Sequence, residues 1–329
     1  MRPSLVDTAG YPEQTVEKVE RLLELLIEIN GHPYLAPRLR LHGGTALNVF
    51  HLSMPRLSVD ADLTYMGRVA LEEYEDERPV LEAALAELGT RLGYRVTTSD
   101  KVEHSGRTLK LRYRYGDQPD LVKVDLIYLN RAPLLPAETA TCSACSPEIA
   151  VTTLALAELV AGKTKALFDR LAIRDLYDIH RIQTGGLPVE MAGGDADTYR
   201  LQRRVRLCYV SLSSSFPCPV DATIAERFSN RREDIQTDLY PVLNMADRPA
   251  LNEMIENASR FIVDHVAPTE DEETEYLRLL DEESEYAPEL LFSPWPDVLA
   301  QARMSPAALW KVQNLRNRPA PPPGDYPEW

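Results

Sequence analysis

The segment from Leu41 to Leu63, LHGGTALNVFHLSMPRLSVDADL, constrains the fold more than any other part of the chain. It joins a Gly-Gly-Thr turn to an apolar run and then to an Asp-x-Asp pair, Asp60 and Asp62. If Ser58 to Leu63 forms a strand, side chains alternate between faces, so the two carboxylates project from the same face. Neighbouring carboxylates repel one another, and a divalent cation that prefers oxygen ligands, magnesium or manganese, would relieve that repulsion.

The Gly43-Gly44-Thr45 turn adds an anion-binding element to this segment. Glycine lets the backbone approach a ligand closely, and the free amides at the start of the following helix favour phosphate groups. We therefore expect Gly43, Gly44 and Thr45 to bind the β- and γ-phosphates of a nucleoside triphosphate, while Arg56 and Ser58 steady the turn or the phosphates. Phosphate binding beside a metal site predicts nucleotidyl transfer.

A second carboxylate site follows from the stretch Leu121 to Leu129, LVKVDLIYL, which is nearly all apolar and predicts a central strand. Asp125 interrupts it, and a buried carboxylate without a partner is costly. A cation or a hydrogen-bond donor should therefore lie beside Asp125. An ordinary ion pair with Lys123 or Lys110 is the alternative.

The predicted strand from Thr108 to Tyr115 places its basic side chains, Lys110, Arg112 and Arg114, on one face. A solvated sheet face explains this row most simply. A row that contacts the phosphates of a triphosphate or of RNA is the sharper interpretation.

From Ile149 onward the pattern is helical. On one continuous helix, Lys163, Arg170 and Arg174 would share a positive stripe that could neutralise charge on a bound triphosphate. The alternative is structural: Arg174 and Asp178 would form a surface pair at i,i+4, and Asp175 would cap the helix.

These motifs carry a resemblance to a known family. Gly43-Gly44-Thr45 followed by Arg56-Leu57-Ser58-Val59-Asp60-Ala61-Asp62 resembles the signature of the polymerase-β-like nucleotidyltransferases, in the form typical of the AbiEii/MenT toxins of bacterial toxin–antitoxin systems. Glu158 to Asp178, ELVAGKTKALFDRLAIRDLYD, is similar to a second block of that branch. Weaker matches follow at Pro288 to Phe292 and Ser305 to Lys311.

The resemblance implies an α/β fold, with a polymerase-β-like nucleotidyltransferase core built on a small mixed sheet and a mostly helical C-terminal region. Residues 1–150 would hold the metal and triphosphate site, and residues 151–329 would complete it and bind the acceptor. Asp125 would join Asp60 and Asp62 as the third metal ligand. Lys163 would contact triphosphate oxygens, and Asp175 or Asp178 would orient Lys163 or act as a polar neighbour.

The resemblance also implies a reaction. A nucleotide would pass from an NTP to the 3′ acceptor end of tRNA, which blocks charging and translation until a cognate antitoxin neutralises the toxin. Three other uses of the site stay open. The acceptor could be a protein or a small molecule, the transferred group could be the γ-phosphate, or the domain could bind nucleotides without catalysis.

Composition sets outer bounds on these interpretations. The chain has 329 residues, 44% of them hydrophobic and 26% charged, which is ordinary for a soluble globular protein with room for two domains. We find no apolar run of membrane-spanning length and no signal-peptide core at the N-terminus, so we expect a cytoplasmic protein without a membrane partner. Four cysteines make no disulfide framework, and Cys142-Ser143-Ala144-Cys145 is interpreted as small residues at a turn.

The formal net charge of −15 argues against a general nucleic-acid coat protein but permits a local basic groove. The acidic residues are unevenly placed: ten of the 51 lie between Glu270 and Glu289, a run that we interpret as a solvated helix face or loop. The best candidates for a surface that follows an RNA backbone are seven arginines, although solvated helix faces are the commoner explanation: Arg200, Arg203, Arg204, Arg206, Arg227, Arg231 and Arg232.

Overall fold

The computed structural model describes residues 2–67, 69–98, 106–185 and 195–318. Its centre is a mixed sheet in the order β4-β5-β6-β3-β2-β9-β7. Two pairs, β3 with β6 and β2 with β9, are parallel, and the remaining neighbours are antiparallel. The strands are β2 (Leu39–His42), β3 (Asp60–Tyr65), β4 (Arg95–Thr98), β5 (Gly106–Tyr115), β6 (Gln118–Ile127), β7 (Glu138–Cys142) and β9 (Ile149–Thr153), with a small separate pair of β1 (Ser4–Leu5) and β8 (Cys145–Ser146).

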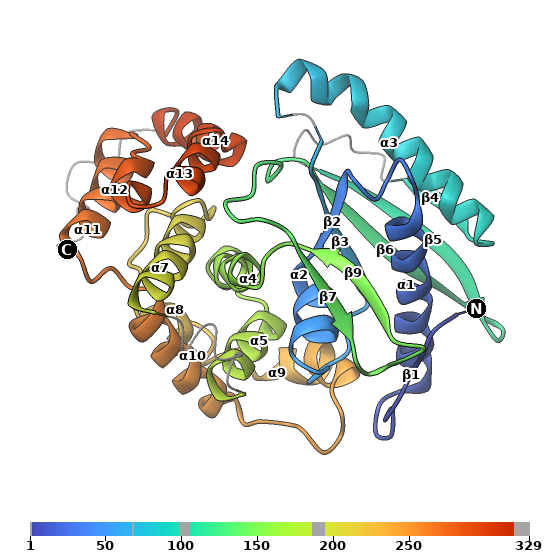
Figure 1. The fold of residues 1–329 in the computed structure, drawn as a ribbon. Helices are drawn as coiled ribbons and strands as arrows, with labels where there is room; N and C mark the ends of the chain where they lie inside the picture. The colour runs from blue at the N-terminus through green and yellow to red at the C-terminus, as the bar shows by residue number, and fades with distance from the viewer. Residues whose placement is uncertain (1, 68, 99–105, 186–194, 319–329) are drawn as a thin grey trace.

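One face of this sheet is covered by α1 (Glu13–Gly31) and α3 (Leu71–Arg91) (Figure 1). The period-two alternation of the strands supplies the core beneath them: Val122, Val124 and Leu126 of β6 are buried and join one hydrophobic cluster. The residues between them on β6 point to the opposite face, which is the face that carries Asp125. Alternation in the sequence thus separates the core side of the sheet from the polar side.

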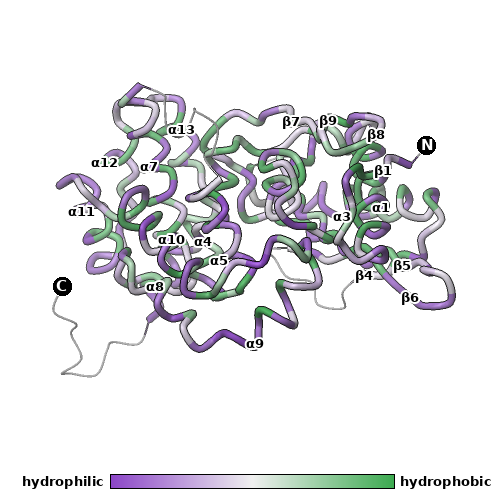
Figure 2. Tube along the Cα trace, turned by 90° about the horizontal axis from the view of Figure 1, so that it is seen from below, coloured by the Kyte–Doolittle hydropathy of each residue, from purple (hydrophilic) through white to green (hydrophobic). Residues whose placement is uncertain are grey.

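A second hydrophobic cluster lies on the polar side and is built mainly from helices α4 (Leu156–Arg170), α5 (Ile173–Thr184), α7 (Ala196–Ser211) and α10 (Leu251–His265). Figure 1 shows these helices, with the C-terminal ones beyond them, on the side of the sheet away from α1. In Figure 2 apolar segments gather along α1 and the strands, whereas the run around α9 is hydrophilic. The remaining elements are α8 (Thr223–Glu226), α9 (Arg232–Asp234), η2 (Ile235–Leu239), η3 (Tyr240–Val242), α11 (Asp271–Arg278), η4 (Leu279–Glu283), α12 (Pro288–Phe292), α13 (Pro296–Arg303) and α14 (Pro306–Arg316).

The α/β fold with a small mixed sheet and a helical C-terminal region is confirmed. The prediction of helix from Ile149 onward is wrong at its start, because Ile149–Thr153 is strand β9 and pairs with β2 and β7. The domain boundary drawn at residue 150 therefore falls inside a strand. The single helix expected through Lys163 and Arg174 is also broken, since α4 ends at Arg170 and the next residue, Leu171, is left-handed with φ of 49°.

Cys142 and Cys145 are joined by a disulfide that closes the short connection between β7 and β8. The interpretation of this motif as small residues at a turn missed that bond. Cys208 and Cys218 are free. Among the residues that the structure describes, no helix is long and apolar enough to cross a bilayer.

Candidate active site

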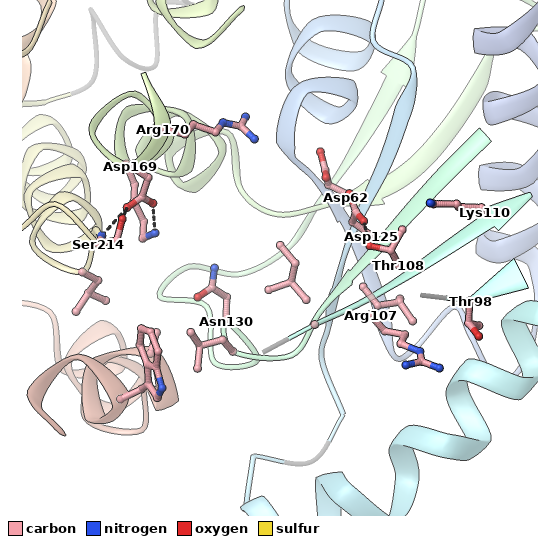
Figure 3. Close-up of a pocket in the computed structure, with 18 of the residues that line it drawn as sticks. Asp62, Thr98, Arg107, Thr108, Lys110, Asp125, Asn130, Asp169, Arg170 and Ser214 are labelled. Atoms are coloured by element: carbon pink, nitrogen blue, oxygen red, sulfur yellow. Dashed lines mark hydrogen bonds and ion pairs between the residues drawn. The ribbon is translucent and has the colours of Figure 1, made fainter. Parts of the chain in front are cut away.

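The register of β3 and β6 brings the predicted carboxylates together. Asp62 lies directly opposite Asp125, and Asp60 lies opposite Lys123, so the three carboxylates share one face of two neighbouring parallel strands. Burial, followed by the charge of Asp125, raises the pKa of Asp62 to about 6. Burial, followed by the charge of Asp62, also raises the pKa of Asp60. Figure 3 shows Asp62 and Asp125 side by side at the edge of a cavity.

Asp125 has protein partners on both of its oxygens. The Thr108 hydroxyl donates to Oδ1 over 2.5 Å, and Lys123 Nζ lies 2.5 Å from Oδ2. The ion pair with Lys123 is the alternative that the sequence left open for this residue. Within the described ranges, no group of three His, Cys, Asp or Glu side chains is drawn together closely enough to hold a metal ion. The carboxylates are therefore aligned, but Asp125 is held by Lys123.

The glycine turn is fitted tightly against these carboxylates. Gly43 has φ of +69°, and a Cβ at this position would lie 2.1 Å from Oδ2 of Asp62. A Cβ on Gly44 would lie 2.9 Å from both Arg56 Nη2 and Ser58 Oγ. Only glycine allows β2 to turn so closely past the carboxylate. The turn opens a short helical segment, α2 (Gly43–Thr45) and the π-helical η1 (Ala46–His51).

Thr45 and Arg56 both contact protein rather than open cavity. Thr45 Oγ1 donates to the backbone carbonyl of Asp60 over 2.6 Å, which ties the turn to β3. Arg56 is 3% exposed and donates to both oxygens of Asp178, each over 2.7 Å. Of the two roles predicted for Arg56, this geometry matches steadying of the turn.

Asp178 and Asp175 hold Lys163 between them at the heart of a buried ionic network. Lys163 Nζ lies 2.8 Å from Asp175 Oδ1 and 2.8 Å from Asp178 Oδ2. Arg170 donates to both oxygens of Asp175, over 2.7 and 3.0 Å. Burial opposes ionisation of Asp175 and Asp178, yet their cationic partners hold the pKa of each carboxyl below its usual range. Three cations against two carboxylates leave a positive charge beside Asp62, and Lys163 and Arg170 lower the pKa of Asp62 accordingly.

The structural alternative proposed for this helix is wrong in its details. Asp178 pairs with Arg56 and Lys163 rather than with Arg174, and the side chain of Asp175 does not cap α5. Arg174 instead lines a separate cavity of about 240 Å³, and its charge lowers the pKa of Asp60.

Two site residues were not predicted from the sequence. His42 lies opposite Asp62 in the β2–β3 register, and burial lowers its pKa to about 4. Its Nε2 is buried and has no hydrogen-bond partner among the residues that the structure describes. Glu158 accepts hydrogen bonds from the Leu134 amide and the Tyr209 hydroxyl over 2.7 and 2.8 Å, and burial raises its pKa to about 7. The position of His42 directly before Gly43 was the signal that could have identified it.

Two cavities meet at Asp62. An inner one of about 240 Å³ is lined by His42, Gly43, Gly44 and Lys163. An outer one of about 1170 Å³ extends between the β5–β6 side of the sheet and the C-terminal helices. Figure 3 shows its two walls, with Lys110 and Thr108 on one side and Asp169, Arg170 and Ser214 on the other. Arg170 lines both cavities.

The arginines of α7 that were expected to form an RNA surface bond to other parts of the protein. Arg204 and Arg206 are buried, and Arg200 and Arg204 both donate to Glu270. Arg203 donates to Glu273, which is itself 1% exposed. Glu270 and Glu273 are therefore partners of α7, which contradicts an RNA surface on that helix, whereas Asp271 and Glu272 of the same acidic run are exposed, as a solvated helix face predicts.

The family described as "Nucleotidyl transferase AbiEii toxin, Type IV TA system" matches residues 24–281. The chain belongs to this family. No curated protein matches the chain. The structure resembles MenT4, a nucleotidyltransferase toxin from Mycobacterium tuberculosis H37Rv, with a TM-score of 0.57 and 19% identity over 86% of this chain and 91% of MenT4. It also matches JHP933 from Helicobacter pylori, with a TM-score of 0.47 and 16% identity over 77% of this chain and 92% of that one.

Proposed function

We propose that this AbiEii-family toxin transfers a nucleoside monophosphate from an NTP to the 3′ acceptor end of tRNA in the cytoplasm. Blocked tRNA cannot be charged, so translation would stop. A cognate antitoxin would neutralise the effect. The observation that carries the proposal is the row of Asp60, Asp62 and Asp125 on one sheet face, next to the close approach of Gly43 and the positive surplus around Lys163.

The residues of this row suit a divalent cation such as Mg²⁺ or Mn²⁺. They offer carboxylate oxygens, the ligands that such hard cations prefer. Burial beside another carboxylate raises the pKa of Asp62 to about 6, and a bound cation would compensate that unfavourable charge. Asp60 and Asp62 would hold the ion, and Asp125 would join them by exchanging its ion pair with Lys123 for the cation; when bound, the ion would neutralise triphosphate charge and lower the pKa of the attacking hydroxyl.

The inner cavity would receive the triphosphate. Gly43 and Gly44 line it, and a Cβ at either position would collide with a neighbouring side chain, Asp62 in the first case and Arg56 and Ser58 in the second. Lys163 is fixed by two carboxylates, so its charge is oriented before substrate binds. Arg170 keeps an exposed side chain despite its bonds to Asp175 and can reach phosphate oxygens from the cavity wall.

The reaction follows from this placement. The acceptor hydroxyl oxygen bonds to the α-phosphorus as the bond from that phosphorus to the bridging oxygen of pyrophosphate breaks. Pyrophosphate leaves with the electron pair, and the hydroxyl proton passes to solvent. The side chains contribute positioning and charge neutralisation rather than covalent chemistry.

Incubation of the purified protein with tRNA, Mg²⁺ and each α-³²P-labelled NTP tests the proposal. We expect label on the RNA with at least one nucleotide and none with Asp62→Asn. Parallel reactions with γ-labelled NTP and with total cell extract identify phosphate transfer or a protein acceptor. Unlabelled RNA with all four nucleotides would remove the tRNA assignment.

A further inference from the structure

The outer cavity is larger than a nucleotide requires. Small-ligand sites usually measure about 300–1,000 Å³, whereas this cavity holds about 1170 Å³ and adjoins the separate inner cavity at the glycine turn. The two share six lining residues: Asp62, Ile127, Asn130, Lys165, Asp169 and Arg170. A donor in the inner cavity and an acceptor in the outer one would therefore meet where the carboxylates lie.

The wall of the outer cavity is positive in a strongly negative protein. Five basic side chains and three carboxylates line it, although the whole chain carries a formal net charge of −15. Lys110 and Arg112 form no hydrogen bond or ion pair with any residue the structure describes, and Arg112 is exposed. They are two residues apart on one face of β5, about 7 Å along the strand, which suits successive phosphates of an extended nucleic-acid strand.

An exposed aromatic side chain lies on the opposite wall. Trp310 of α14 is 53% exposed and lines the same cavity as Lys110 and Arg112. Its neighbour Leu309 is 66% exposed but does not line the cavity. Proteins that bind single-stranded nucleic acid combine a basic groove with aromatic rings on which bases stack. An acidic peptide would use the cations but would leave the indole without a matching partner.

We propose that the outer cavity binds the single-stranded 3′ end of the RNA acceptor, with one of its bases stacked on Trp310 and its backbone phosphates held by Lys110 and Arg112. This inference rests on the proposed function, since it assigns the acceptor of that same site. Trp310 then positions the acceptor and does not touch the reacting atoms.

Binding of a fluorescein-labelled single-stranded RNA oligonucleotide, measured by anisotropy, tests this inference without turnover. We expect Trp310→Ala to bind about 5- to 100-fold more weakly than the wild type, as for loss of one stacked base. Trp310→Phe should recover most of the affinity, and Leu309→Ala should match the wild type. The double variant Lys110→Ala/Arg112→Ala should bind more weakly and show a shallower salt dependence.

The inactive Asp62→Asn protein separates this inference from the proposed function, because it should still bind the oligonucleotide like the wild type. In the labelling assay, Trp310→Ala should raise the KM for RNA and leave the KM for NTP unchanged. Equal RNA affinity of Trp310→Ala and the wild type would overturn the stacking assignment even if RNA is labelled. Trp310-dependent binding without any labelling would instead overturn the proposed reaction alone.

Discussion

The guanidinium of Arg56 and the carboxylate of Asp178 are joined by two hydrogen bonds of 2.7 Å each, through Nε and Nη2. Both side chains are buried, and they connect the segment that precedes β3 to α5. Asp178 also binds Lys163, so one carboxylate fixes the loop behind Gly44 and a cation of the site together.

Removal of that carboxylate should therefore destabilise the protein. Asp178→Ala leaves Arg56 buried without its partner and Lys163 with only Asp175, and we expect a loss of about 3–5 kcal/mol in the free energy of unfolding. Urea denaturation measures the loss. Asp117→Ala is the matched control, because the Asp117 side chain is fully exposed in its pair with Arg114 and should change stability by less than about 0.5 kcal/mol. Equal losses in the free energy of unfolding for Asp178→Ala and Asp117→Ala would contradict a stabilising role of the buried network.

Gly43→Ala should reduce turnover far more than a comparable glycine change elsewhere. Gly43 and Gly116 both have positive φ, +69° and +55°, so alanine at either position costs about 1–2 kcal/mol of backbone strain. Only the Gly43 Cβ meets another group, Asp62 Oδ2 at 2.1 Å, whereas Gly116 faces open space. We expect a fall in kcat of about 100-fold for Gly43→Ala and none for Gly116→Ala, measured as label transfer per enzyme. Comparable activity of Gly43→Ala and Gly116→Ala would show that the close approach of Gly43 to Asp62 is not required for turnover.

The stability of the metal-free protein should depend on the ionisation of Asp62. Its pKa is raised to about 6 in the folded state, chiefly by burial and by Asp125. A raised folded-state pKa favours the protonated form, so its stabilising contribution is present at pH 4 and is lost as the pH rises through 6. Asp62→Asn does not ionise and should gain about 1–2 kcal/mol relative to the wild type between pH 4 and pH 8. Urea denaturation in EDTA measures this difference, and parallel pH profiles for the two proteins would refute it.

Magnesium should offset the loss of stability that ionisation of Asp62 causes in the wild type. A ligand that binds only the folded protein stabilises it by about 2.7 kcal/mol at a concentration of 100 times Kd. We expect Mg²⁺ to raise the Tm of the wild type and to have little effect on Asp62→Asn or Asp60→Asn. Equal increases in Tm for the wild type, Asp62→Asn and Asp60→Asn would show that Mg²⁺ binds at a site other than these carboxylates.

Arg170 and Arg174 should differ in function although the sequence grouped them on one stripe. Arg170 lines both cavities at Asp62, and its side chain is 63% exposed, whereas Arg174 lines the separate cavity near Lys18. Arg170→Ala should raise the KM for NTP and lower kcat, with a modest change in stability because Lys163 still pairs with Asp175. Arg174→Ala should retain nearly full activity. Titration of both variants with NTP measures this difference. Equal increases in the KM for NTP would show that the two arginines contribute equally to triphosphate binding and would contradict the prediction.

The carboxylate row could be predicted because it depends on local rules. A period of two along Ser58 to Leu63 places Asp60 and Asp62 on one face whatever the rest of the fold does. The apolar run around Asp125 likewise identified a central strand. Pairing of β3 with β6 could not be derived from either segment alone.

Other features depend on tertiary contacts that carry no local signal. The break after Arg170 lies in Arg170-Leu171-Ala172, which has neither glycine nor proline to mark it, yet Leu171 adopts the left-handed conformation. Arg204 pairs with Glu270 across 66 residues, so its burial could not be read from α7 itself. At Ile149–Thr153 a signal was present but missed, because β-branched residues favour strand over helix.

The chain of alternating charges that runs from buried Arg56 through Asp178, Lys163 and Asp175 to exposed Arg170 has a consequence for synthesis on the ribosome. A nascent polypeptide that has emerged only as far as Thr153 contains every strand of the large sheet. It still lacks the charged groups of α4 and α5, namely Lys163, Arg170, Asp175 and Asp178. Under the proposed function, such an intermediate would lack the cations that neutralise triphosphate charge and would not transfer nucleotides to the tRNA of the machinery that is still producing it. On that proposal, transfer activity would begin only once α4 and α5 have folded against the sheet.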